Sequence, residues 1–281
     1  MSGERGHAWA YEALLLVLAL ACGLFGYGLP GTSVDVGWKP SAKPEDGLRI
    51  VTWNLGGSAG GGGRRFDDEQ LDAVAASLRY IDPDIVVVQE LRGRGQLRRL
   101  ANALGSETSV AFDQGIDGRG VGAIATSGGL QKLDPPRGAN GAPLSVRFVM
   151  EDGRKLHICG LHAHPWSASS RNEAIGRSVD LLEDEGERYG VLLGDLNLDL
   201  DRGKRQDLFT DDEHLDIQTY NYAAKRLFDA GLGGGPTAEP DRRLDYIFVS
   251  GSLEVLTCAP FLDQRRGDMD HHPVVADVAF R

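Results

Sequence analysis

The sequence predicts an α/β protein. Short apolar runs of the kind that form buried strands recur along the chain, and segments between several of them repeat apolar residues every three or four positions, as amphipathic helices do. The composition is ordinary for a globular α/β domain, with 41% hydrophobic and 25% charged residues. The net charge of -11 at pH 7 argues against loose electrostatic binding to nucleic acid or anionic membranes. It does not argue against an enzyme that uses a metal cation to bind a phosphate.

Residues 1–29 form an apolar leader that precedes the folded domain. Its densest part, residues 13–29, lies at the short edge of the range of about 17–25 residues that spans a bilayer. A signal anchor fits this segment, and so does a signal peptide cleaved after Ala19-Leu20-Ala21. A lipid-modified Cys22 is a third alternative. We expect the folded domain to be membrane-anchored or secreted, outside the cytoplasm.

A linker and one domain follow the leader. Residues 30–46 contain three prolines and mixed charge, so we expect an extended linker. Residues 47–281 show no further linker and are expected to form a single domain.

Strands and helices alternate in the first part of this domain. Residues 67–81 have apolar residues at helical spacing and acidic residues at their start, and Pro83 follows them. Residues 56–63, GGSAGGGG, are too rich in glycine for regular structure. Strands are predicted at 48–54, 85–88, 108–112 and 121–126, and helices at 67–81 and 96–104.

The second part of the domain begins with a hairpin. Asp152-Gly153 between two apolar runs is the strongest hairpin signal in the chain. Cys159 and Cys258 both lie in predicted strands, and whether they form a disulfide is open. Strands are predicted at 143–151, 155–161, 191–193, 244–249, 253–258 and 274–280, and helices at 169–184 and 218–230.

The central strand ends in two polar residues. The apolar run at 191–193 is followed by Gly194, Asp195 and Asn197. Residues two apart in an extended backbone point to the same side, so this carboxylate and this carboxamide are expected to project together. The carboxylate can take a proton from water, and the amide can donate to developing negative charge. A simple Asx-type turn is the alternative.

Other predicted strands also carry a metal-binding or proton-transferring residue at a terminus. Ligands of α/β proteins gather where strand ends meet loops. A hard cation such as Mg²⁺ prefers oxygen ligands, and the absence of clustered cysteines argues against a dedicated zinc site. The strand-end residues are Asn54, Glu90, His162, Asp195 with Asn197, and Asp245, and the pair Asp270-His271 precedes the last strand.

Six stretches carry a family resemblance. They are LRIVTWNLGG, PDIVVVQE, LHAHP, GDLNLD, RRLDYIFVS and DHHPVVADV, in this order between Leu48 and Arg281. The sequence resembles the endonuclease/exonuclease/phosphatase superfamily, which includes deoxyribonuclease I and exonuclease III-like enzymes. The resemblance implies a four-layer sandwich of two mixed β-sheets flanked by helices, preceded here by the hydrophobic segment.

The same resemblance implies a hydrolase. The implied enzyme is a divalent-metal-dependent phosphoesterase that cleaves phosphodiester bonds by water attack, with Mg²⁺ as the metal and Mn²⁺ as an alternative. A nuclease acting on nucleic acid is favoured. A sphingomyelinase or phospholipid phosphodiesterase and an inositol-phosphate-type phosphatase are alternatives, and an inert binding module on the same fold is a third class. We expect a monomer that meets the membrane through its N-terminal segment.

Residue roles follow from the same motifs. Asp195 deprotonates the attacking water, Asn197 steadies the phosphoryl oxygens, Asp245 pairs with His271, and His162 contacts the phosphate or protonates the leaving group. The implied metal ligands are Asn54, Glu90 and Asp270. The implied substrate-binding residues are His164, Trp166 and Arg171, and His164 could also take the place of His162.

Two positions depart from the family pattern. Some nucleases of the family carry an aspartate two residues after the strand-end asparagine, where this chain has Gly56. A second metal bound there is therefore not expected. The serine common before the Asp-His pair is Met269, which removes a small hydrogen bond.

Overall fold

The computed structural model describes residues 42–56, 68–105, 108–115, 119–133, 142–184, 188–200, 210–262, 264 and 269–281. The predicted leader, most of the linker and residues 57–63 of the glycine-rich loop lie outside these residues. Among the helices in the described part of the chain, none is long and apolar enough to cross a membrane.

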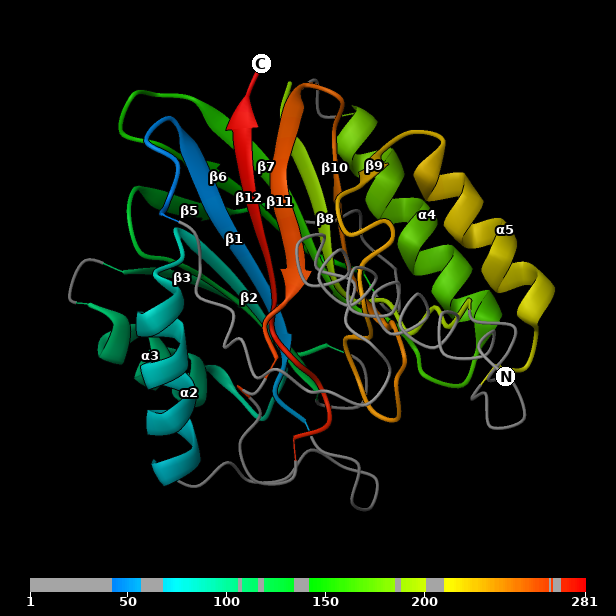
Figure 1. Ribbon diagram of the computed structural model, residues 1–281, viewed down its shortest axis with the longest axis horizontal. Coiled ribbons are helices and arrows are strands. Elements are labelled where there is room, and N and C mark those ends of the chain that lie inside the picture. The colour runs from blue at the N-terminus through cyan, green and yellow to red at the C-terminus, as the bar shows by residue number, and fades with distance from the viewer. Residues whose placement is uncertain are drawn as a thin grey trace, which may run out of the picture. The chain divides into compact units, whose positions relative to one another are not determined.

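Two six-stranded sheets stack face to face, as predicted (Figure 1). The first sheet has the order β11-β12-β1-β2-β4-β3, with strands β1 (Gly47–Asn54), β2 (Ile85–Leu91), β3 (Ser109–Asp113), β4 (Gly120–Ala125), β11 (Leu253–Pro260) and β12 (Val274–Phe280). The second has the order β5-β6-β7-β8-β10-β9, with strands β5 (Gly129–Lys132), β6 (Leu144–Val149), β7 (Lys155–His162), β8 (Gly190–Asp195), β9 (Phe228–Asp229) and β10 (Asp245–Val249). Both sheets mix parallel and antiparallel pairs.

Helices cover the outer face of each sheet, which makes four layers (Figure 1). Helices α2 (Asp68–Ile81) and α3 (Arg94–Leu104) pack on the first sheet. Helices α4 (Ala168–Asp184) and α5 (Glu213–Ala224) belong to the second, and α4 contributes more buried residues than α5 to the core between the helices and this sheet.

Alternate residues of each strand point to opposite faces of its sheet. One set is buried between the two sheets, in the inner core, and the other set is buried against the helices, in an outer core. In β1, Ile50 is buried between the sheets, whereas Val51 and Trp53 are buried against the helices. In β8, Leu193 faces the inner core and Leu192 the helices. At the ends of these strands, the residues that point between the sheets are polar. One edge of the inner layer therefore carries side chains that can take part in chemistry.

The predicted helix at 218–230 is wrong in its bounds. Helix α5 begins at Glu213, because the side chain of Asp212 caps it by accepting a hydrogen bond from the backbone N–H of Leu215 at 3.0 Å. It ends at Ala224, and the chain then turns into the short strand β9. The strands β5 and β9 were not predicted from the sequence. Both sit at an edge of the second sheet, and both are too short to show a clear pattern.

The remaining predicted strands and helices are present with small differences in their bounds, and the Asp152-Gly153 hairpin joins β6 to β7. Cys159 and Cys258 are free thiols. His157 is buried and bonded to Ser145, with 2.7 Å between Nε2 and Oγ.

Strand directions bring the polar ends together. β1 and β2 run parallel, as do β7 and β8, so the carboxyl ends within each pair share one edge, and His162 pairs with Asp195. β10 runs antiparallel to β8, so Asp245, at the beginning of its strand, also pairs with Asp195.

Candidate active site

A β-bulge aims Glu90 into the space between the sheets. The pairing of β2 with β4 shifts register between Val88 and Leu91, and Glu90 has a φ of 61°. Val88 and Leu91 both face the helices, so the extra residue of the bulge lets Glu90 point the other way. A left-handed backbone is unfavourable for glutamate, and such strain is typical of functional sites.

Asn54 links Glu90 to Asp195. Its Nδ2 donates to Asp195 Oδ2 at 2.9 Å and lies 3.5 Å from Glu90 Oε1, while its Oδ1 accepts the backbone N–H of Gly56 at 2.8 Å. The Gly56 bond fixes which end of the amide points at the carboxylates. Asn54 therefore orients both acidic groups.

Gly56 leaves room for Glu90. A Cβ atom at position 56 would lie 2.1 Å from Glu90 Oε2 and 2.4 Å from Glu90 Cδ. The departure from the family pattern noted at Gly56 thus has a steric counterpart, because a side chain there would take the space of the Glu90 carboxylate.

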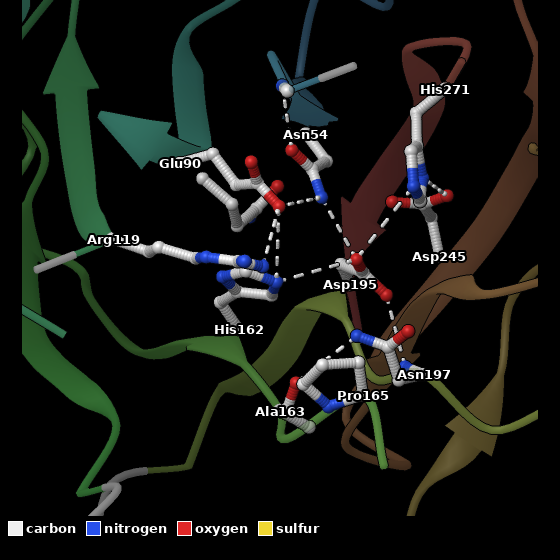
Figure 2. Close-up of polar contacts among 12 residues, drawn as sticks. Asn54, Glu90, Arg119, His162, Ala163, Pro165, Asp195, Asn197, Asp245 and His271 are labelled. Atoms are coloured by element: carbon white, nitrogen blue, oxygen red, sulfur yellow. Dashed lines mark hydrogen bonds and ion pairs between the residues drawn. The ribbon is translucent and has the colours of Figure 1, made fainter. Parts of the chain in front are cut away.

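Asp195 lies at the centre of the cluster (Figure 2). It is 2% exposed, and its Oδ2 lies 3.6 Å from His162 Nε2 and 3.8 Å from His271 Nε2. Burial raises the pKa of Asp195, the opposing charge of His271 lowers it, and the net direction is upward. A carboxylate with a raised pKa is better suited to accept a proton from water near neutral pH.

The predicted contact between Asp245 and His271 is present. Asp245 Oδ2 lies 2.8 Å from His271 Nδ1 and also accepts a 2.7 Å hydrogen bond from Thr237 Oγ1. Burial lowers the pKa of His271, but the negative charges of Asp245 and Asp195 outweigh it and raise the pKa to about 10. His271 is therefore an imidazolium at neutral pH.

His162 has the opposite protonation state. Burial lowers its pKa to about 4; Asp195 opposes this shift and the positive charge of Arg119 adds to it. A neutral imidazole at this point can donate one hydrogen bond from its ring, but it does not carry the proton of a general acid at rest.

Asn197 reaches the site in a different way from the prediction. Strand β8 ends at Asp195, and Asn197 has a φ of 49°, so the extended-backbone reasoning fails at this residue. Its backbone N–H donates to Asp195 Oδ1 at 3.0 Å, which is the Asx-type turn considered as the alternative. Its Nδ2 donates to the carbonyl of Ala163 at 3.0 Å and stays next to Asp195 (Figure 2).

The predicted substrate contact of Arg171 is wrong. Arg171 is fully buried and forms a double hydrogen bond with Asp216 at 2.8 and 2.7 Å. Its Nη1 donates to the carbonyls of His164 and Pro165 at 2.8 and 2.9 Å. With no exposed surface to meet a ligand, Arg171 acts on the site only by holding this loop.

His164 and Trp166 belong to the loop that Arg171 holds. His164 Nδ1 accepts the backbone N–H groups of Trp166 and Ser167, both at 3.1 Å. Trp166 is 57% exposed. His162, rather than His164, is the histidine that lies against Glu90 and Asp195.

The donor set suits a divalent cation. Carboxyl groups of Glu90, Asp195, Asp245 and Asp270 gather here, and burial, with the charges of Glu90 and Asp195 adding to it, raises the pKa of Asp270. Asp245 Oδ1 is buried and has no hydrogen-bond partner among the described residues. Hard oxygen ligands of this kind fit Mg²⁺ or Mn²⁺.

Ligand atoms of Asp195, Asp245 and His271 also lie within 4.8 Å of one another. A single ion bound by all three would compete with the hydrogen bond between Asp245 and His271. Glu90 has a looser environment, since its nearest donors lie at 3.4 to 3.7 Å. The side of the site around Glu90 could therefore hold a divalent cation without displacing a short hydrogen bond.

Two residues of the site escaped the sequence reasoning. Arg119 Nη1 lies 3.4 Å from Glu90 Oε1, and Thr237 holds Asp245. Arg119 precedes β4, whose beginning lies beside the end of its antiparallel neighbour β2. A search limited to residues at the carboxyl ends of strands misses Arg119. Its place directly before a strand that runs antiparallel to β2 is the signal that could have found it. Thr237 lies in a loop with no periodic pattern.

Comparison with known proteins agrees with this geometry. The sequence matches the profile of the Endonuclease/Exonuclease/phosphatase family over residues 51–266. The chain belongs to this family. No curated protein sequence matches it. The family assignment confirms the resemblance carried by the six stretches.

Solved structures of the endonuclease/exonuclease/phosphatase family share the fold. A family member from Beutenbergia cavernae is 23% identical with a TM-score of 0.60, covering 84% of this chain and 72% of its own. A mannosyl-6-phosphatase from Bacteroides thetaiotaomicron is 19% identical with a TM-score of 0.62, covering 83% and 100%. The human Nocturnin catalytic domain with a bound sulfate anion is 16% identical with a TM-score of 0.61, covering 85% and 97%.

Proposed function

We propose that this chain is a divalent-metal-dependent phosphoesterase that hydrolyses a phosphodiester by direct attack of water. The observation that carries the proposal is the buried carboxylate of Asp195, oriented by Asn54 and placed between a neutral and a protonated histidine. Phosphoryl transfer requires positioning and charge neutralisation more than covalent chemistry.

Each side chain has a separate part in the reaction. Asp195 orients the water and accepts its proton. His271, protonated and held by Asp245, donates to a phosphoryl oxygen and offsets its charge. His162 is neutral and serves as a hydrogen-bond donor to the phosphate, so its pKa favours this role over protonation of the leaving group.

Metal ligands of the proposed enzyme are Glu90 and Asp270, with Asn54 orienting Glu90. A bound ion would neutralise the phosphate and offset the charge that develops on the leaving oxygen, which would then take its proton from water. Mg²⁺ is proposed first and Mn²⁺ second, because both accept an oxygen-rich site.

A nucleic-acid phosphodiester is our first proposed substrate, supported by the nuclease-like style of the GDLN and RRLDYIFVS stretches. A phosphomonoester of the inositol phosphate kind is the second candidate. The net charge of -11 opposes long-range attraction of a polyanion, and this favours a small substrate. A phospholipid phosphodiester suits a membrane-tethered protein, if the leader acts as proposed below.

The place of action is part of the proposal. The apolar residues 1–29 support a domain that is anchored at a membrane or secreted, outside the cytoplasm. Protease accessibility of the domain in intact cells tests this directly, since a domain inside the cytoplasm would be protected.

The test is hydrolysis by the full-length chain with Mg²⁺, with Mn²⁺ or with EDTA. Plasmid DNA, RNA, sphingomyelin, an inositol polyphosphate and a sugar phosphate are offered side by side, with the Asp195→Asn variant as the matched inactive control. We expect metal-dependent turnover of one class that the variant lacks. Turnover of no substrate by folded protein in either metal would favour the inert binding module instead.

A further inference from the structure

Among the described residues, Arg119 is the one arginine or lysine whose side chain forms an ion pair with Glu90, and no family motif includes it. It precedes β4, and a Cβ at Gly115, whose φ is 66°, would lie 2.0 Å from the Arg119 carbonyl oxygen. Its side chain is 29% exposed, so it reaches from solvent into the site. Figure 2 shows Arg119 and His271 on opposite sides of Asp195.

Its bond to Glu90 is weak. The 3.4 Å between Arg119 Nη1 and Glu90 Oε1 exceeds the roughly 2.7–2.9 Å of a good charge-assisted hydrogen bond. Partly exposed ion pairs of this kind shift an equilibrium by at most about fivefold. Within the described part of the chain the guanidinium bonds to Glu90 alone, so most of its N–H donors are available to another acceptor.

We propose that Arg119 is an anion-binding residue of the site, which leaves Glu90 when a divalent cation takes that carboxylate and then binds an anionic oxygen of the substrate phosphate. A cation and a guanidinium cannot both make full use of one carboxylate. The released guanidinium presents a planar set of donors that matches phosphate oxygens. This inference rests on the proposed phosphoesterase function and adds a residue to it.

The position of Arg119 limits which part of the substrate it can meet. It lies on the Glu90 and His162 side of the site, and it is close enough to His162 to lower its pKa. His271 supplies positive charge on the other side, so a phosphate held between them has a cationic contact at each flank. The acceptor is one of two kinds of oxygen. It is either a phosphoryl oxygen that diesters and monoesters share, or the second anionic oxygen that a monoester carries and a diester lacks.

The first measurement is calorimetric titration of Mn²⁺ into the full-length chain, without substrate. Arg119→Gln should bind Mn²⁺ about two- to fivefold more tightly than wild type, because a competitor for Glu90 is removed. Arg98→Gln is the matched control, since it removes an exposed arginine of α3 and should leave the affinity unchanged. Absence of Mn²⁺ binding by wild type, or unchanged affinity in Arg119→Gln, would overturn the release of Arg119.

The second measurement is binding of inorganic phosphate, phenyl phosphate and diphenyl phosphate to the Mn²⁺-loaded proteins. Arg119→Gln should weaken inorganic phosphate about tenfold, and Arg119→Lys should recover part of the loss because it keeps the charge. Equal losses for both phenyl compounds assign Arg119 to the phosphoryl oxygens. A loss of affinity confined to phenyl phosphate assigns Arg119 to the second anionic oxygen, which diphenyl phosphate lacks. Wild-type phosphate affinity in Arg119→Gln overturns anion binding.

Thermal unfolding of each variant separates these effects from misfolding, and Arg119→Lys replaces Arg119→Gln in the anion assay if the latter does not fold. The two proposals fail separately. Substrate-free binding results as expected, with no turnover of any phosphoester, would leave the role of Arg119 intact and overturn the enzymatic function. Metal-dependent turnover by wild type, with unaltered Mn²⁺ and phosphate binding in Arg119→Gln, would support the enzymatic function and overturn the role of Arg119.

Discussion

Gly56→Ala should weaken metal binding at the proposed Glu90 position without unfolding the protein. The new Cβ would lie 2.1 Å from Glu90 Oε2, whereas non-bonded heavy atoms settle at about 3.5–4.0 Å. The carboxylate must therefore move by roughly 1 Å or more. The clashing atoms belong to the flexible end of a side chain, and the backbone of Gly56 is not left-handed, so alanine itself fits the chain.

We expect metal affinity to fall about tenfold to hundredfold, the range seen when the groups that place a metal ligand are changed. The free energy of unfolding should change by about 1 kcal/mol or less, because the lower entropy of the unfolded alanine chain offsets local strain. Calorimetric Mn²⁺ titration and chemical denaturation measure the two quantities.

Gly176→Ala is the control for Gly56→Ala. Gly176 lies in α4, and a Cβ there meets no atom within 4 Å, so this variant should gain about 0.5–1 kcal/mol of stability and keep wild-type metal affinity. Wild-type metal affinity in folded Gly56→Ala would refute the assignment of Glu90 as a metal ligand in this position.

Three further predictions address the cluster and its frame. Asp195→Asn should keep the fold and lower hydrolysis by about 10²–10⁴-fold, the usual contribution of a general base; full activity in a turnover assay would contradict the role of Asp195. In metal-free protein the raised pKa of His271 stabilises the fold fully below pH 6.5, and this contribution is lost as the pH rises through about 10. Asp245→Asn should move that loss to lower pH, which NMR titration of His271 and denaturation at pH 6 and 9 would show. Gly194→Ala should destabilise by about 3 kcal/mol or more in chemical denaturation, since Gly194 has a φ of 143° and its Cβ would lie 1.9 Å from the carbonyl oxygen of Leu161; a small loss would show that β7 and β8 can separate.

Much of the fold was predictable because hydrophobic spacing is a local property. The helix at 67–81 and the hairpin at Asp152-Gly153 carry their own signals and appear nearly where expected. The bounds of α5 failed because its cap, Asp212, lies outside the window in which the apolar pattern was read. The pairing order of the strands depends on contacts across the whole chain and was not predicted; the family resemblance supplied only the two mixed sheets flanked by helices.

The candidate site was predictable where one strand end carries one polar residue. Asp195, His162 and Asn54 lie together as expected. Arg171 failed because sequence position near a site says nothing about direction: its side chain turns inward to Asp216 in α5. Arg119 and Thr237 were missed because they come from the start of a strand and from a loop.

The bulge at Glu90 lowers the thermal stability of the protein, while it places a carboxylate that the proposed activity needs. A left-handed glutamate costs about 1–2 kcal/mol relative to a residue suited to that backbone, and Glu90 adds negative charge beside Asp195 and Asp270. Glu90→Gly should therefore melt at a higher temperature while losing the proposed metal ligand. Selection of this protein for thermal tolerance alone would drive position 90 toward glycine, and the variants that survive heating best would be the ones that no longer work.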